Sequence, residues 1–417
     1  MENDTFDKFN DYYSCKLKIN NIQVPIRNIQ KIVFREWIFD PICSLEISIL
    51  DTGVFIEMTP LFDESPIEFD IIRHDGKNIL TLNYVLNDFE YEKVNVDGGS
   101  LYAINMTAFP KSNQYLYPAT TRNFLNMTSE EVVAEIANDN DMNYVKHTNS
   151  NDNQNWFQIA LNDFDMIKHI IKKAYIKQED LPLVYMDRHN NINYNSLQTM
   201  CVKEPKYKAY CDDILVNDVE SIINKDSVES YKKVANKDVM FFKTGYKFKS
   251  IASSMNKDMA YGVDMTYFDH KNFYRYVTNF NISPLSTYAN INKNNKNLLT
   301  KSYTFNTIHR NSHKNYLIAT IQNPYIKTIF FNSYLQIVVN VCDVNLGDII
   351  DIVIPDSTSQ NLNGVKSVDV VNSGKYLVGG IMQDIRKDGY YGMVLTLFRN
   401  GVNDSNFDGK LFEMLKV

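Results

Sequence analysis

The sequence predicts an α+β protein that is mainly β, in which two β-rich regions flank an α/β insertion. Short runs of alternating apolar and polar residues fill residues 15–110 and return at residues 321–405. Capped, amphipathic helices are predicted between these two regions. Aromatic residues make up 13% of the chain, with 27 Tyr and 24 Phe, which is typical of β-rich proteins. We therefore divide the 417 residues into regions 1–112, 113–320 and 321–417.

The first region contains six candidate strands. They are CKLKI, NIQKIVFREW, CSLEISILD, PIEFDIIR, NILTLNYVLNDFEYE and GSLYAINMTAF. Turn signals separate them at Asp51-Thr52-Gly53, His74-Asp75-Gly76 and Asp97-Gly98-Gly99. Many short strands at regular spacing are typical of a closed or nearly closed barrel.

The middle region begins with two predicted helices. MTSEEVVAEIANDNDM predicts a helix capped by Thr128, with Glu131 completing a capping box. After the polar loop KHTNSNDNQN, either Asn162 or Asp163 caps a second helix. The predicted apolar stripe of this second helix is Phe164, Ile167, Ile171 and Ala174.

A hairpin, LPLVYMDRHNNINYNSL, follows the second helix and turns at residues 187–191. From Cys211 to about Asn332 the pattern is weakest: VNDVESIINKDSVESYKKV fits a strand, a loop or a short helix, and NINKNNKN predicts an exposed loop. The β pattern returns at TIFFNSYLQIVVN and LGDIIDIVIP, and a polar loop, DSTSQNLNGVKSVDVVN, comes next. A second hairpin, residues 373–404, turns at Asp388-Gly389, and both faces of its strands are apolar, so we expect both to be covered.

Composition narrows the class of protein. The net charge of −7 disfavours a surface dominated by phosphate binding. Five scattered cysteines with no CxxC spacing indicate neither a disulfide framework nor a zinc site, and they suit a reducing compartment. We expect neither a signal peptide nor a membrane segment, because the N-terminus lacks an apolar core and no apolar stretch of about 18 residues occurs.

Two groups of residues in the sequence contain metal-ligand types. Asp139, Asp141 and Asn143 match the start of a calcium loop, but Tyr144 and Ser150 stand where that loop needs Gly and Glu. The alternative to a calcium site is a polar C-terminal end of the preceding helix. The spacing of His169, His189, Cys201 and Cys211 fits no zinc signature. No nucleophile elbow, phosphate-binding glycine loop, dinucleotide fingerprint or zinc-protease motif occurs. We therefore predict no catalytic, cofactor-binding or metal residues, no cofactor and no enzymatic activity.

Three segments occur in a distinctive order. VFREWIFDPICSLEISILD places two strands around a short connection, and NWFQIALNDFDMIKHIIKKAYIKQEDLPLVYMDRHNNINYNSL places a helix before a hairpin. LGDIIDIVIP then precedes GKYLVGGIMQDIRKDGYYGMVLTLFRNG. In this order they resemble the tail hub proteins of long-tailed phages, including the baseplate hub of contractile tails. The same family covers the N-terminal part of type VI secretion spike proteins.

The resemblance implies two tube-type β-barrel domains flanking the insertion. It implies a structural protein of the virion tail, assembled in the host bacterial cytoplasm, which joins the tail tube to the tail-tip spike. Genome DNA would pass through its lumen during ejection without specific binding. The implied partners are the tail tube protein and spike or tail-tip proteins. No needle repeat or lysozyme-like domain follows Val417, so we expect a spike or hydrolase to be a separate chain.

Two similar wall units per chain would let three chains match a sixfold tube, so we expect a homotrimer. Apolar strand faces such as Tyr391, Met393 and Leu395 are expected to lie between neighbouring chains. One alternative is a tail protein that binds or degrades host-surface glycans; the only tryptophans, Trp37 and Trp156, sit in apolar patterns, which disfavours it. A distal tail or tube adaptor protein of sixfold symmetry is the other alternative.

Overall fold

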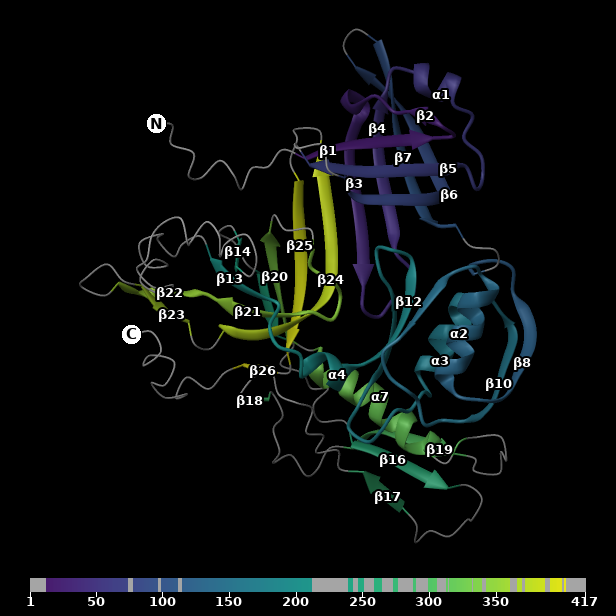
Figure 1. The fold of residues 1–417 in the computed structure, drawn as a ribbon, viewed down its shortest axis with the longest axis vertical. Helices are drawn as coiled ribbons and strands as arrows, with labels where there is room; N and C mark the ends of the chain where they lie inside the picture. Colours follow the sequence, from purple (N-terminus) through teal and green to yellow (C-terminus); the bar gives the residue numbers. More distant parts are fainter. Residues whose placement is uncertain are drawn as a thin grey trace.

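The fold is mainly β, with a few helices gathered in the middle of the chain (Figure 1). The computed structural model describes most of the chain between Tyr13 and Val402. The described residues are 13–73, 78–96, 99–111, 115–211, 239–242, 247–250, 259–264, 273–276, 288–289, 299–305, 313, 315–331, 333–339, 343–360, 366–369, 372–386, 391–399 and 401–402. Within these ranges, no helix is both long and apolar enough to cross a membrane.

All six strands predicted in the first region form. They are β1 (Tyr13–Ile19), β3 (Ile29–Trp37), β4 (Ser44–Asp51), β5 (Pro66–Arg73), β6 (Asn78–Val96) and β7 (Gly99–Pro110). The two-residue strand β2 (Ile22–Gln23), a 3-10 turn at Ile26–Asn28 and helix α1 (Val54–Met58) form in addition. The strands pair in the order β3-β4-β7-β6-β5-β1-β2. The sheet curls so that β1, β5 and the start of β6 cross over β3, β4 and β7 (Figure 1). Alternating residues of both layers, such as Leu17 and Ile47, are thereby buried.

A second group of strands closes on itself through successive pairing. Its members are β13 (Tyr207–Cys211), β14 (Val239–Phe242), β20 (Ser333–Val339), β25 (Tyr391–Arg399), β24 (Gly374–Arg386) and β21 (Ile349–Val353). Each pairs with the next, and β21 pairs back with β13. We call this set the strand circuit. β13 and β14 join it from within residues 113–320, although most of its strands follow residue 321.

The other described strands that follow β13 in sequence are short and lie beside or outside the circuit. They are β15 (Lys247–Ser250), β16 (Met259–Asp264), β17 (Phe273–Tyr276), β18 (Tyr288–Ala289), β19 (Leu299–Phe305), β22 (Pro355–Gln360), β23 (Lys366–Val368) and β26 (Gly401–Val402). β22 and β23 pair inside the segment expected to be a polar loop. The predicted turn Asp388-Gly389 and the predicted turn residues His74, Asp75, Gly76, Asp97 and Gly98 lie outside the described residues.

The insertion packs helices against short strands. Its elements are β8 (Thr120–Met127), α2 (Ser129–Asp139), β9 (Asn143–Lys146), β10 (Gln154–Leu161), α3 (Asp163–Ile171), β11 (Pro182–Met186), β12 (Asn191–Ser196) and α4 (Leu197–Cys201). α2 and α3 lie inside the arc formed by β8 and β10 (Figure 1). The predicted caps are confirmed: Thr128 and Glu131 form the capping box of α2, and Asn162 caps α3.

Two predictions about helices were wrong in part. The stripe on α3 is rotated: Met166, Ile167 and Ile170 are fully buried, whereas Phe164 and Ile171 are half-buried. The segment beginning TIFFNSY is not all strand, because helix α7 (Tyr316–Phe330) occupies its first residues before β20 starts. Pro324 lies inside this helix. Because an interior proline usually ends a helix, the sequence pattern does not predict α7.

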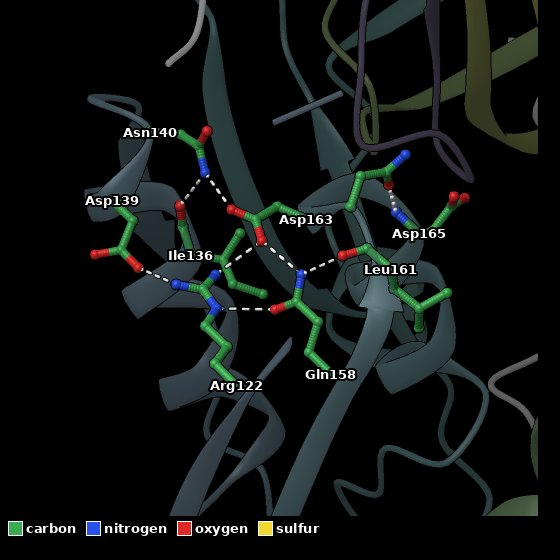
Figure 2. Close-up of polar contacts among 9 residues, drawn as sticks. Arg122, Ile136, Asp139, Asn140, Gln158, Leu161, Asp163 and Asp165 are labelled. Carbon is green, nitrogen blue, oxygen red and sulfur yellow. Dashed lines mark hydrogen bonds and ion pairs between the residues drawn. The ribbon is translucent and has the colours of Figure 1, made fainter. Parts of the chain in front are cut away.

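A polar network centred on the buried Asp163 carboxylate holds the insertion together (Figure 2). The guanidinium of Arg122 on β8 donates to Gln158 at 2.8 Å and to Asp163 at 2.8 Å, and it also contacts Asp139. Asn140 and Gln158 donate to the same Asp163 carboxylate at 2.7 and 2.8 Å. β8, β10 and the end of α2 thus each contribute a donor to the nearly buried Asp163 carboxylate. These donors compensate its negative charge.

Candidate functional site: the junction of the two strand groups

Strand β24 joins the first strand group to the strand circuit. Its start, Gly374–Leu377, pairs with β21, and its later residues, Gly380–Arg386, pair with β3. β25 runs along its other edge from Leu377 to Ile385. β24 therefore changes partner on one edge near Gly379, where its pairing with β25 also shifts register. This single strand fixes how the first group and the circuit are placed relative to each other.

Two adjacent glycines make the change of partner possible. A Cβ atom on Gly380 would overlap the ring of Trp37 on β3, and one on Gly379 would overlap the ring of Phe398 on β25. Trp37 and Phe398 pack edge to face, with ring centroids 5.6 Å apart. The missing side chains let both rings lie directly on the β24 backbone.

The β11–β12 hairpin of the insertion packs against the same junction. Arg188, in the turn between β11 and β12, lies 3.0 Å from the Glu36 carboxylate on β3, and its backbone N–H donates to Glu36 at 2.8 Å. The same guanidinium donates to the carbonyl of Val344, which precedes β21. Both charged side chains are buried. One side chain of the insertion thus bonds to the first group and to the segment entering the circuit.

Burial dominates the electrostatics of this pair. It raises the pKa of Glu36, while the neighbouring Arg188 opposes that rise. The hairpin strand β11 is buried on both faces: Val184 and Met186 belong to the core beneath the first group, and Leu183 and Tyr185 to the core of the circuit. The hairpin therefore forms the partition between two hydrophobic cores.

The closing hairpin confirms one expectation and corrects another. Both faces of β24 are covered from Tyr376 to Gly380. Met393 and Leu395 on β25, however, are fully buried in the chain's own core and do not face a neighbouring chain. The Tyr391 side chain lies outside the described part of the structure.

The residues of the partial calcium loop are spread over separate contacts. Asp139 pairs with Arg122, Asp141 is exposed with a φ of 54°, and Tyr144 donates to Glu130 at 3.1 Å. The hydroxyl of Ser150 accepts the N–H of Glu130 at 3.2 Å. Asn143 opens strand β9.

The histidines and cysteines also lie apart. His169 on α3 lies 2.9 Å from the amine of Lys173, and His189 is exposed in the hairpin turn. Cys201 is buried in α4, and Cys211 ends β13. Across the described ranges, no three His, Cys, Asp or Glu side chains gather closely enough to hold a metal ion.

Sequence reasoning missed the junction, although weak signals were present. In IVFREW, Glu36 follows Ile32 and Phe34 at alternate positions, on the apolar face of the strand, and Gly379-Gly380 interrupts an otherwise bulky strand. A charge on an apolar face predicts a buried partner but does not say which one. The partner, Arg188, lies in a turn where an exposed side chain is the ordinary expectation.

Comparison with solved structures places the fold among phage tail proteins. The 43 kDa tail protein of prophage MuSo2 from Shewanella oneidensis matches with a TM-score of 0.58 and 10% identity, over 93% of this chain and 98% of that one. A tail protein from Neisseria meningitidis MC58 matches with a TM-score of 0.54 and 9% identity, over 94% and 97%. An E. coli component of the type VI secretion system matches with a TM-score of 0.47 and 12% identity, over 92% of this chain and 76% of that one. No protein-family model and no curated protein matches the sequence. The chain shares the fold of the first two tail proteins over nearly its whole length.

Proposed function

We propose that this chain is a tail hub protein of a bacteriophage virion, which joins the tail tube to the tail-tip spike. The observation that carries the proposal is the shared fold with the MuSo2 tail protein, which spans 98% of that protein and 93% of this one. Because the match covers both strand groups and the insertion, it concerns the arrangement of the whole chain. The protein is a structural component of the tail, assembled in the host bacterial cytoplasm, and not an enzyme.

In this proposal the two strand groups are tube-type barrel domains that act as two wall units of a ring. The strand circuit has each of its six strands paired on both sides, which leaves little edge exposed to aggregation. The β3–β24 pairing joins the circuit rigidly to the first group. Three chains would supply six wall units, which matches a sixfold tube on one side and a threefold spike on the other.

A reconstruction of the tail of the virion that carries this chain tests the proposal. We expect three copies in a ring between the tail tube and the spike, with the two strand groups at equivalent radii. A ring of six copies would favour the distal tail or tube adaptor. Copies located only on peripheral fibres would favour the glycan-binding alternative.

The conduit part of the proposal has its own test. A wall that gripped phosphate would slow the passage of DNA, and the net charge of −7 opposes such binding. We expect no measurable affinity for duplex DNA at physiological salt, where nonspecific binders show a Kd of about 10⁻⁴–10⁻⁶ M. A micromolar interaction that weakens steeply with added salt would contradict a passive conduit.

A further inference from the structure

Two helices that are far apart in sequence bring basic side chains together on one surface. α7 packs along the C-terminal end of α3, where Asn323 donates to the carbonyls of Ile171 and Ala174 at 3.2 and 2.8 Å. The side chains gathered there, which we call the basic cluster, are Lys168, His169, Lys172, Lys173 and Lys327.

One end of the basic cluster lies over the loop that follows β3. The Lys327 amine sits 4.0 Å from the ring centroid of Phe39, and the Lys168 amine lies 3.3 Å from the Asp40 carboxylate. Lys168 also lies 4.0 Å from the ring centroid of Phe164. Both amines therefore lie over aromatic rings, beside the loop that carries Phe39 and Asp40.

The other end of the basic cluster lies one turn further along α3. The Lys173 amine is 2.9 Å from the His169 ring and 5.7 Å from the ring centroid of Tyr316 on α7. Lys172 is exposed between the two ends, and its charge acts on His169, Lys173 and Lys327 alike. The five groups are therefore one electrostatic unit.

Positive charge in this unit exceeds the negative charge that faces it. Among the described residues, Asp40 is the one carboxylate that forms an ion pair with the cluster, and its partner is Lys168. Burial lowers the pKa of Lys173 and of Lys327. The charge of Lys172 lowers both further, whereas the Asp40 carboxylate opposes the shift of the Lys327 pKa. An anion bound at this surface would relieve that repulsion.

We propose that the basic cluster is a docking surface for an acidic segment of another protein. Charge complementarity selects a partner rich in carboxylates, and the half-buried rings of Phe39, Phe164 and Tyr316 add apolar contact at the same place. Nucleic acid fits less well, because the Asp40 carboxylate lies within the cluster and would face a continuous row of phosphates. The inference goes beyond the hub role and does not depend on it.

Binding of a fluorescently labelled poly-glutamate peptide to the full chain at low salt tests this docking surface. Lys172→Glu reverses an exposed charge at the centre of the cluster, and we expect it to weaken binding at least about tenfold, or about 1.4 kcal/mol. Lys172→Arg keeps the charge and should retain binding. Lys203→Glu is the matched control: it makes the same charge change at an exposed position outside the cluster, and binding should stay near the parent value.

Three results would overturn the inference. The first is no binding of poly-glutamate by the parent chain. The second is an equal loss for Lys172→Glu and Lys203→Glu, which would mean that only overall charge matters. The third is displacement of the peptide by a short duplex DNA of equal or higher affinity, which would assign the surface to nucleic acid. None of these bears on the copy number of the chain in the tail, so the hub proposal stands or falls separately.

Discussion

The Glu36 carboxylate on β3 lies 3.0 Å from the guanidinium of Arg188 in the β11–β12 turn, and both side chains are almost completely buried. These residues are 152 positions apart in sequence. Their ion pair ties the insertion to the first strand group at the point where that group meets the circuit. A substitution in this ion pair therefore tests the packing of the insertion, the first strand group and the circuit together.

Removing one partner of this ion pair should destabilise the fold strongly. Arg188→Met leaves the Glu36 carboxylate buried without its counter-charge, and we expect a loss of about 3–5 kcal/mol in the free energy of unfolding. The double variant Glu36→Leu with Arg188→Met removes both charges and should be more stable than Arg188→Met alone. Urea unfolding measures each value. Lys18→Met is the surface control, because the pair of Lys18 with Glu68 is exposed to solvent and should contribute little to stability. Equal losses for Arg188→Met and Lys18→Met would contradict the assigned burial.

A methyl group at Gly380 should disturb the change of strand partner. Gly380→Ala places a Cβ against the Trp37 ring, and overpacking of this kind costs about 1–3 kcal/mol. The cost should shrink in a Trp37→Leu background, because the smaller side chain frees the space. A double-mutant cycle by chemical unfolding measures the coupling. Lys375→Ala, on the exposed start of β24, is the control. A Gly380→Ala cost that is unchanged by Trp37→Leu would rule out the ring as the cause.

A charge in the core of the insertion should not be tolerated. Ile167 on α3 is fully buried, so Ile167→Asp puts a carboxylate without a partner into an apolar site and should cost about 3–5 kcal/mol. Ile167→Val removes one methylene and should cost about 1 kcal/mol. The melting temperatures of both variants and the parent, measured by thermal unfolding, test these two values. Identical melting of Ile167→Asp and the parent would mean that α3 does not pack as described.

Stability should fall in mild acid through His313. The side chain is buried and its Nε2 lies 3.1 Å from the Lys173 carbonyl; burial lowers its pKa below the ordinary value of 6.5. As the pH falls below 6.5, the unfolded chain binds a proton that the folded chain does not, so stability is lost until the lowered pKa is passed. His313→Gln should flatten the dependence of unfolding free energy on pH in this window. A parent whose stability is constant from neutral pH to pH 5 would refute the assignment.

Local pattern alone was enough to identify the strands of the first group and the capped starts of α2 and α3. Alternation of apolar residues sets which face of a strand is buried, and a Thr128–Glu131 capping box satisfies N–H groups within its own turn, so neither depends on distant chain. Tertiary structure decided the rest. Strand periodicity does not name a pairing partner, so the division of β24 between β21 and β3 could not be read from its residues. The same holds for Arg188 and for the lysines of α3 and α7: each looks like an ordinary surface charge until packing places Glu36 beside the first and gathers the others on one face.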